Sequence, residues 1–289
     1  MSHTQPPAPP FLRRLHDPRP LLAVELRPPR STLSAAEGLE AWIDANHSVR
    51  RLSELDTVVF LTDNAVGSRE EENLQHLLSN LGPDADPGKL VPFLTSKHSL
   101  DYCTWYAQRA AQGGFRSLVV LGGDRHDGVA RCVPHAQELR RLLRAKVPGL
   151  TLGGWANPNR DAVEQVGWLA DSSFEGEFFL TQVVSHFRLS PVERFLAETQ
   201  RRGLALPGLF GVFYYRSGNP KTLARLGQFI PVPDEEVRQA FASGVTPDEL
   251  AAATLRELFA LGIRSVYISN LPTLEAPRIL ARLARMVFD

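Results

Sequence analysis

The stretch Leu21-Leu22-Ala23-Val24-Glu25-Leu26-Arg27 decides the fold class of this chain. It is a short, almost continuous apolar run, which is typical of a parallel strand covered on both faces. Its length and its branched residues favour a strand over a segment of buried helix. Further runs of this kind, which bring the number of predicted strands to eight, lie at residues 57–63, 90–96, 117–123, 150–156, 178–184, 208–214 and 265–271.

Helix signals lie between these runs. Thr246-Pro247-Asp248-Glu249 has the pattern of a capping box with proline at the first helical position, and Ser190-Pro191-Val192-Glu193 repeats it. Gly203 and Gly262 end the two helices. Strands that alternate with helices pair in parallel through right-handed crossovers. An open doubly wound sheet satisfies the same pattern, but eight strands within 289 residues favour a single (β/α)8 TIM barrel.

The barrel domain is expected over residues 21–289, with an N-terminal extension before it. Residues 1–20 contain prolines 6, 7, 9, 10, 18 and 20, and we interpret this segment as a Pro-rich leader that is stiff or disordered. Residues 231–244 are expected to insert a helix before the final β/α unit. No G-x-G-x-x-G motif follows the first strand, which argues against a Rossmann-type dinucleotide domain.

Composition excludes several classes of protein. Lys+Arg and Asp+Glu both total 32, so the chain lacks the positive charge of a nucleic-acid binder. No apolar run approaches the roughly 18 residues that cross a bilayer, and no secretory signal is present, so we expect a cytoplasmic protein. Cys103 and Cys132 are too few for a disulfide framework and are expected to stay reduced. No histidine spacing indicates a metal site. The oligomeric state stays open, a homo-oligomer included.

Glu25 is the most informative candidate for chemistry. In a barrel of this kind, catalytic groups lie at the C-terminal ends of the strands. Glu25 has only apolar neighbours within its strand. Burial raises the pKa of a carboxyl group, and a raised pKa suits a general acid near neutral pH. The alternative interpretation is a structural ion pair with Arg27 or another barrel residue.

Other strand ends carry polar or aromatic candidates. Asp124 follows Gly122 and Gly123, which allow a ring system to approach the backbone; the alternative is a turn or helix-capping aspartate. Gln182 lies inside an apolar run, where a buried amide needs either a protein partner or the polar edge of a ligand. The remaining candidates, which include two aromatic side chains that either stack on a planar ligand or pack at the rim, are Thr62, Asn64, Thr95, Trp155, Asn157, Tyr214 and Asn270.

Short motifs at these strand ends resemble the methylenetetrahydrofolate reductase family. Val24-Glu25-Leu26-Arg27-Pro28-Pro29 is similar to the family's F-E-F-x-P-P motif. Six further matches follow in family order along residues 21–289. They are Leu61-Thr62-Asp63-Asn64-Ala65 (V-T-x-G-A), Leu94-Thr95 (H-L-T), Leu121-Gly122-Gly123-Asp124 (L-R-G-D), Leu180-Thr181-Gln182 (I-T-Q), Gly208-Leu209-Phe210-Gly211-Val212 (P-G-I) and Tyr267-Ile268-Ser269-Asn270 (Y-T-L-N).

The resemblance implies a specific reaction, the reduction of 5,10-methylenetetrahydrofolate to 5-methyltetrahydrofolate with hydride from NAD(P)H, in most family members through FAD. Glu25 would be the catalytic acid, and Asp124 would contact the pterin and tune the hydride donor. Gln182, Tyr214 and Asn270 would bind the tetrahydrofolate-type substrate. The expected cofactor-binding residues are Thr62, Asn64, Thr95, Gly122, Gly123, Trp155, Asn157 and Asn159.

The chain also departs from the family pattern. Phe93 stands for the histidine before L-T, Gly122 for the arginine of L-R-G-D, and Asn159 for the histidine of A-Y-P-x-x-H. Leu271 stands for the arginine after the last asparagine. These changes are compatible with altered flavin binding or with direct hydride transfer from NAD(P)H. Two further hypotheses stay open, a barrel enzyme acting on another one-carbon or pterin substrate and a non-catalytic folate-binding partner subunit.

Overall fold

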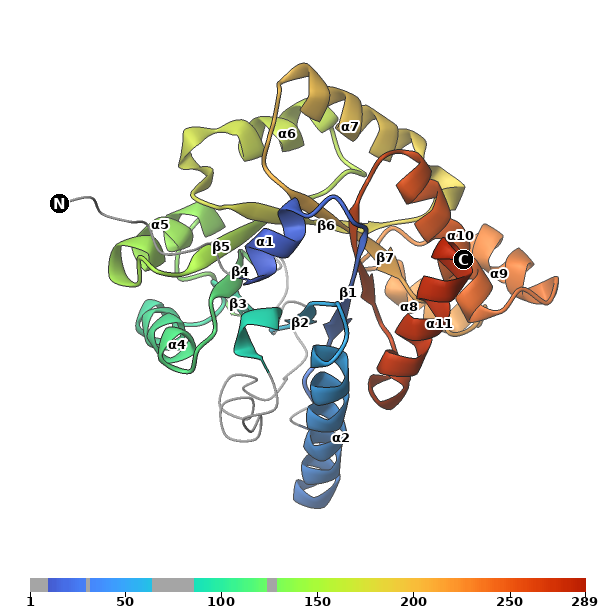
Figure 1. The fold of residues 1–289 in the computed structure, drawn as a ribbon, viewed down its shortest axis with the longest axis horizontal. Helices are drawn as coiled ribbons and strands as arrows, with labels where there is room; N and C mark the ends of the chain where they lie inside the picture. Colours follow the sequence, from blue (N-terminus) through green and yellow to red (C-terminus); the bar gives the residue numbers. More distant parts are fainter. Residues whose placement is uncertain (1–9, 30–31, 64–85, 124–128) are drawn as a thin grey trace.

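The computed structural model describes residues 10–29, 32–63, 86–123 and 129–289. Eight parallel strands form a closed barrel in chain order, and β1 pairs with β8 to complete it (Figure 1). This confirms the predicted (β/α)8 TIM barrel. The strands are β1 Leu21–Leu26, β2 Val59–Leu61, β3 Leu90–Thr95, β4 Ser117–Leu121, β5 Thr151–Ala156, β6 Phe178–Val184, β7 Gly208–Phe213 and β8 Ser265–Ser269.

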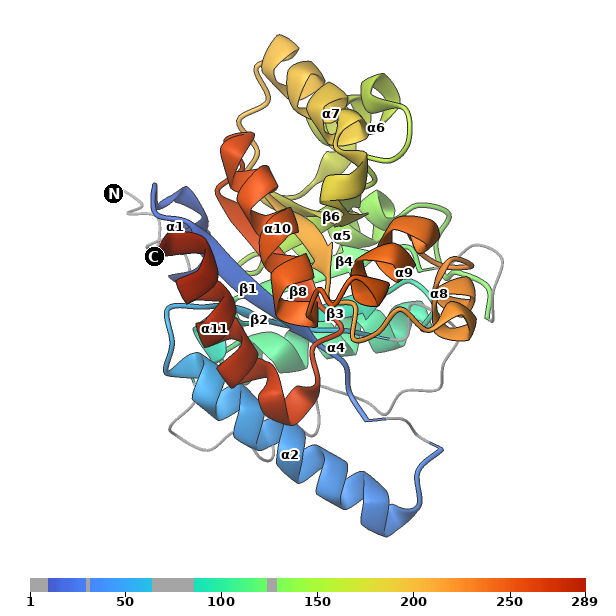
Figure 2. The ribbon, with the colours of Figure 1, turned by 90° about the vertical axis from the view of Figure 1, so that its right-hand side faces the viewer.

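Helices surround the barrel on its outer side (Figures 1 and 2). The capping box at Thr246 is present, because the Thr246 hydroxyl accepts a hydrogen bond from the Glu249 amide at 3.2 Å and the Glu249 carboxylate bonds back. The similar motif at Ser190 does not act in this way, since its helix begins at Ser190 itself and has Leu189 at the cap without a side-chain bond. The helices are α2 Ala35–Ser53, α4 Leu100–Gln112, α5 Ala136–Lys146, α6 Ala162–Ala170, α7 Ser190–Arg201, α8 Pro220–Leu226, α9 Asp234–Ala242, α10 Pro247–Ala260 and α11 Ala276–Phe288, with short 3-10 turns η1 Pro87–Lys89, η2 Ser172–Phe174, η3 His186–Arg188 and η4 Thr273–Glu275.

Side-chain alternation along the strands divides the core in two. Leu22, Val24 and Leu26 of β1 belong to the large cluster between the barrel and its helices. Leu21 and Ala23 belong to the cluster inside the barrel. The same alternation directs Glu25 to the interior, at the C-terminal end of the strand.

The N-terminal segment differs from the expected leader. Pro10–His16 forms helix α1, whose Phe11 and Leu15 are buried. The Phe11 ring meets Phe60 and Phe178 edge to face, at centroid distances of 5.8 Å and 4.8 Å, inside the barrel. Two apolar residues four positions apart form one helical face, and that face closes the N-terminal end of the barrel. Proline content alone did not reveal this role.

The expected insertion before the last β/α unit is present as α9, and α8 precedes it. A small third core packs under these helices, made of Val183 from β6, Phe213 from β7, and Tyr215, Leu223 and Val237. The two helices lie together beside α10 in Figure 2. The insertion thereby covers the C-terminal ends of β6 and β7.

Replacing Phe11 with alanine tests whether α1 is part of the barrel core. We expect Phe11→Ala to lower the free energy of unfolding by about 3 kcal/mol, because it leaves a cavity against Phe60 and Phe178. Chemical denaturation followed by circular dichroism measures this loss. Arg13→Ala, at an exposed position of the same helix, serves as the control and should change stability little. Equal stabilities for the two variants would contradict a structural role for α1.

Candidate functional site

Glu25 forms the centre of the candidate site. Its side chain is only 8% exposed, and its Oε1 accepts a hydrogen bond from the Ser269 hydroxyl at 2.7 Å. Burial raises the pKa of the Glu25 carboxyl group, while the Ser269 hydrogen bond and the positive charge of Arg27 act in the opposite direction. Glu25 therefore holds its proton to a higher pH than an ordinary carboxyl group. This is the property of a general acid.

Tyr267 lies on β8 two residues before Ser269, and its ring belongs to the cluster inside the barrel. Its hydroxyl donates a hydrogen bond to the Thr181 carbonyl at 2.5 Å. A Cβ atom on Gly211 would lie 2.5 Å from the Tyr267 hydroxyl oxygen, so only glycine leaves room for the ring. Burial, together with the charge of Glu25, raises the pKa of Tyr267 well above its ordinary value. Tyr267 therefore stays neutral, and Glu25 is the group at this position that can transfer a proton.

The ends of β2 and β3 are joined by Asp63, the residue that follows Thr62. The Asp63 carboxylate accepts a hydrogen bond from the Thr95 amide at 2.8 Å and pairs with His98 Nε2 at 2.8 Å. Asp63 and His98 follow two successive strands, and their pairing was not predicted from the sequence. Thr62 and Thr95 are both buried here. Within the described residues, no group bonds to the Thr95 hydroxyl.

The two glycines after β4 do not leave an open surface. A Cβ on Gly122 would lie 2.8 Å from Cζ of Arg131, and the Arg131 guanidinium donates to the Gly123 carbonyl. Gly123 has a φ of 70°, and its Cβ position lies 2.7 Å from the Lys97 side chain. The space that these glycines create is thus filled by two cationic side chains of the same chain. Asp124 and Asn64, predicted as catalytic and cofactor-binding residues, lie outside the described residues.

The side-chain amides after β5 and within β6 mainly make hydrogen bonds to residues close to them in sequence. Asn157 Oδ1 accepts from the Asn159 backbone and side chain at 3.0 Å and 3.2 Å, and Asn159 also donates to the Val183 carbonyl. Gln182 Oε1 accepts from the Val183 amide at 2.9 Å, at the register shift between β6 and β7. The Gln182 amide nitrogen makes no hydrogen bond to a described residue, so it can donate to a ligand. Trp155 is half-buried against the interior cluster.

Tyr214, which was predicted to bind substrate together with Gln182 and Asn270, lies in the core between the barrel and its helices. Phe213 is the last residue of β7, and Tyr214 belongs to the outer core. Its hydroxyl donates to Asp248 at 2.6 Å, and Asp248 also accepts from Arg282 at 2.6 Å. The assignment fails because a strand directs neighbouring side chains to opposite faces. Tyr214 anchors β7 to α10 and α11.

Asn270 supports the backbone at the end of β8. It adopts a left-handed conformation with φ of 70°, and its side-chain amide donates to the Tyr214 carbonyl at 3.0 Å. Its own carbonyl accepts two hydrogen bonds from Arg216, at 3.0 Å and 2.8 Å. Its observed contacts join the segments after β7 and β8 and place Arg216 at the rim.

Basic side chains follow several strands at the C-terminal end of the barrel. The charge of Arg27 acts on both Glu25 and Arg216. Burial, and more weakly Arg27, lowers the pKa of Arg216, partly opposed by Tyr214. Lys97 and Arg131 lie at the ends of β3 and β4. We call Arg27, Lys97, Arg131 and Arg216 the basic rim.

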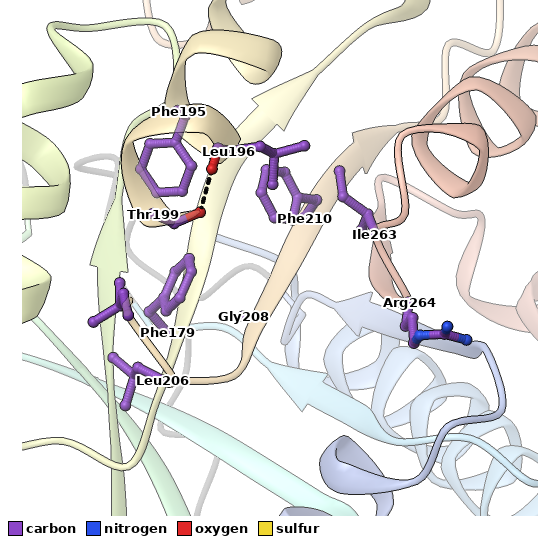
Figure 3. Close-up of a pocket in the computed structure, with 10 residues that line it drawn as sticks. Phe179, Phe195, Leu196, Thr199, Leu206, Gly208, Phe210, Ile263 and Arg264 are labelled. Atoms are coloured by element: carbon purple, nitrogen blue, oxygen red, sulfur yellow. Dashed lines mark hydrogen bonds between the residues drawn. The ribbon is translucent and has the colours of Figure 1, made fainter. Parts of the chain in front are cut away.

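Other features of the described residues do not add a second site. No helix among them is both long enough and apolar enough to cross a membrane. They contain no group of three or more His, Cys, Asp or Glu suited to a metal ion. Figure 3 shows a pocket of about 150 Å³ between α7 and the starts of β6 and β7, lined by Phe179, Phe195, Phe210 and their neighbours. Its lining is mostly apolar, and it lies at the N-terminal end of the strands, away from Glu25.

Solved structures share this fold, although no family model and no curated protein matches the chain. An uncharacterized protein from Clostridium thermocellum that binds two copies of 5-methyl-5,6,7,8-tetrahydrofolic acid has a TM-score of 0.71 and 16% identity, over 96% of this chain and 99% of that chain. An F420-dependent secondary alcohol dehydrogenase in complex with an F420–acetone adduct has a TM-score of 0.56 and 11% identity, over 94% and 100%. The carboxyl transferase domain of Rhizobium etli pyruvate carboxylase has a TM-score of 0.52 and 12% identity, over 95% and 48%. At these identities the TM-scores show a shared fold alone.

The raised pKa of Glu25 predicts a specific dependence of stability on pH. A buried carboxyl with a raised pKa stabilises the fold fully below its unfolded pKa, and that contribution is lost as pH rises through the folded pKa. Glu25→Gln keeps a neutral side chain at every pH. We therefore expect the stability of the variant, relative to the wild type, to increase from weakly acidic to neutral pH, by at most about 1.4 kcal/mol per pH unit.

Denaturant unfolding at several pH values measures this difference. Glu40→Gln, at an exposed position of α2, is the matched control and should follow the wild-type profile. If the Glu25→Gln and wild-type profiles ran parallel, Glu25 would not be a buried carboxyl that ionises at a raised pKa.

Two adjacent tyrosines test the structural role of Tyr214. We expect Tyr214→Phe to lower the free energy of unfolding by about 1–2 kcal/mol, because Asp248 loses a hydrogen-bond donor. Tyr215 is also buried, but its hydroxyl makes no hydrogen bond within the described residues, so Tyr215→Phe should be close to neutral. Thermal and denaturant unfolding of both variants gives the comparison. A neutral Tyr214→Phe would show that the bond to Asp248 contributes nothing to stability.

Proposed function

We propose that this chain reduces 5,10-methylenetetrahydrofolate to 5-methyltetrahydrofolate with hydride from NAD(P)H. The observation that carries the proposal is the buried Glu25 carboxyl, hydrogen-bonded to Ser269 at the C-terminal end of the barrel. The motif resemblance gives this glutamate the role of proton donor. The Clostridium thermocellum neighbour binds the proposed product, which supports a folate ligand for this barrel.

The proposed chemistry needs one proton donor and one hydride donor. Glu25 gives its proton to the bridging nitrogen, the bond from this nitrogen to the one-carbon unit breaks, and an iminium forms on the other nitrogen. Hydride then adds to the iminium carbon and leaves a methyl group, while NAD(P)H becomes NAD(P)+. The Ser269 hydrogen bond and the nearby Arg27 charge stabilise the carboxylate that Glu25 becomes. Solvent restores its proton before the next turnover.

Several described residues that the resemblance predicts to contact flavin are covered or already hydrogen-bonded within the chain. Gly122, which replaces the expected arginine, is covered by Arg131, and Asn157 and Asn159 bond to each other. These positions do not fit the flavin that the resemblance implies. We therefore propose direct hydride transfer from NAD(P)H to the folate.

The basic rim supplies a reason for binding a folate. The glutamyl part of a folate carries carboxylates, and the charge of Arg27 acts on both Glu25 and Arg216. Guanidinium groups bind carboxylates through paired hydrogen bonds. The Gln182 amide nitrogen, which has no described protein acceptor, is proposed to donate to the polar edge of the pterin or nicotinamide.

A second candidate function is a folate-binding protein without catalysis. The Clostridium thermocellum neighbour binds a methylated tetrahydrofolate, and the filled flavin positions agree with this alternative. A buried glutamate would then serve binding alone. Turnover by the wild-type chain distinguishes the two functions.

The decisive experiment measures NAD(P)H oxidation that depends on methylenetetrahydrofolate, with and without added FAD. We expect wild-type turnover without flavin. Glu25→Gln should lower turnover by roughly 10²–10⁴-fold, because a general acid contributes about this factor. Folate affinity, measured by calorimetry, should stay close to the wild-type value because the amide preserves the shape of the side chain.

Glu40→Gln on α2 is the control and should leave both turnover and affinity unchanged. A wild-type protein that binds folate but oxidises no NAD(P)H under either condition would replace the reductase proposal with the binding protein. A Glu25→Gln variant with full turnover would remove Glu25 from the mechanism.

A further inference from the structure

The fold brings the two cysteines of the chain to the same strand end. Cys103 in α4 is fully buried, and its thiol donates to the Thr95 carbonyl at 3.7 Å. Cys132 lies between β4 and α5, and its backbone amide donates to the Ser96 carbonyl at 2.7 Å. Thr95 and Ser96 are consecutive residues at the end of β3. Two cysteines that are distant in sequence are thus hydrogen-bonded to the neighbouring carbonyl groups of Thr95 and Ser96.

The thiols are close enough to act on each other. Cys132 packs against the core cluster that contains Cys103. Burial, followed by the charge and a weak hydrogen bond from Cys132 and by Asp63, raises the pKa of Cys103 to about 12. Cys103 therefore remains a protonated thiol at neutral pH. Cys132 is only partly buried, and it is the thiol that an oxidant in solution reaches first.

We propose that Cys103 and Cys132 form a reversible intramolecular disulfide when the protein meets hydrogen peroxide. The Cys132 thiolate attacks one peroxide oxygen, the O–O bond breaks, and the products are a sulfenic acid and a hydroxide that takes up a proton as water. The Cys103 thiol then attacks the Cys132 sulfur and displaces a second water, which carries away the Cys103 proton. Two thiols and one peroxide give one disulfide and two waters, and an added dithiol reverses the reaction.

The position of Cys132 connects this site with the mouth of the barrel. The preceding residue, Arg131, lies across Gly122 and donates to the Gly123 carbonyl. A disulfide to α4 restricts the segment that carries Arg131, and so fixes one member of the basic rim. The two thiols can form this bond whether or not the barrel carries out the proposed reduction.

The test uses the folded wild-type chain with hydrogen peroxide as the oxidant. After treatment, the protein is unfolded and alkylated, and its mass is measured. We expect both thiols to lose their reactivity toward the alkylating agent, with loss of the mass of two hydrogen atoms and no dimer. A dithiol should restore both thiols. Cys103→Ala should instead trap a sulfenic acid at Cys132 that dimedone labels, and Cys132→Ala should show no label at Cys103.

Either of two results would overturn the inference. Wild-type protein that keeps two free thiols under conditions in which Cys103→Ala is labelled would show that the sulfurs do not meet. A disulfide found only between chains would show that Cys132 pairs outside its own molecule. The wild-type thiol count decides the matter even if a variant folds poorly.

Discussion

The hydrogen bond between Ser269 and Glu25 connects the last strand of the barrel to the first, across 244 positions of sequence. It forms because β1 and β8 pair, and that pairing closes the sheet. A carboxyl in this apolar interior is tolerable only with a partner, since an unpaired buried polar group costs several kcal/mol. The same closure brings Arg27 and Arg216, which follow β1 and β7, within electrostatic range of each other. The bond between Ser269 and Glu25 and the proximity of Arg27 to Arg216 are therefore consequences of barrel closure.

At the mouth of the barrel, the end at which the strands terminate, side chains contact one another or the neighbouring backbone. Arg131 and Lys97 occupy the space above Gly122 and Gly123, and Asn157 and Asn159 bond to each other. Side chains that are already engaged are better placed to hold backbone in position than to receive a large cofactor. Glu25 and the Gln182 amide nitrogen differ, because each retains a proton that it can offer to a ligand. Both residues belong to the set that the motif resemblance singles out, and their roles there stay a prediction.

Much of the fold could be predicted because parallel strands are apolar on both faces and their runs can be recognised along the chain. Each of the eight predicted runs contains the corresponding observed strand, and Glu25 was identified as a charged residue with apolar neighbours on both sides in one of them. Tyr214 was misassigned because a single step along a strand reverses the direction of a side chain. The Asp63–His98 pair and the position of Arg131 depend on contacts between segments separated in sequence, and local pattern carries no such information. Helix α1 was missed because proline content masked the spacing of Phe11 and Leu15.

The plug formed by Phe11 at the N-terminal end has a consequence for kinetics. With that end filled by aromatic rings and the interior packed, small molecules reach Glu25 from the opposite end of the barrel. In the reaction proposed above, the folate and NAD(P)H would therefore both enter through this one opening. Under that proposal, the reactant that lies deeper in the opening enters before the other and leaves after it.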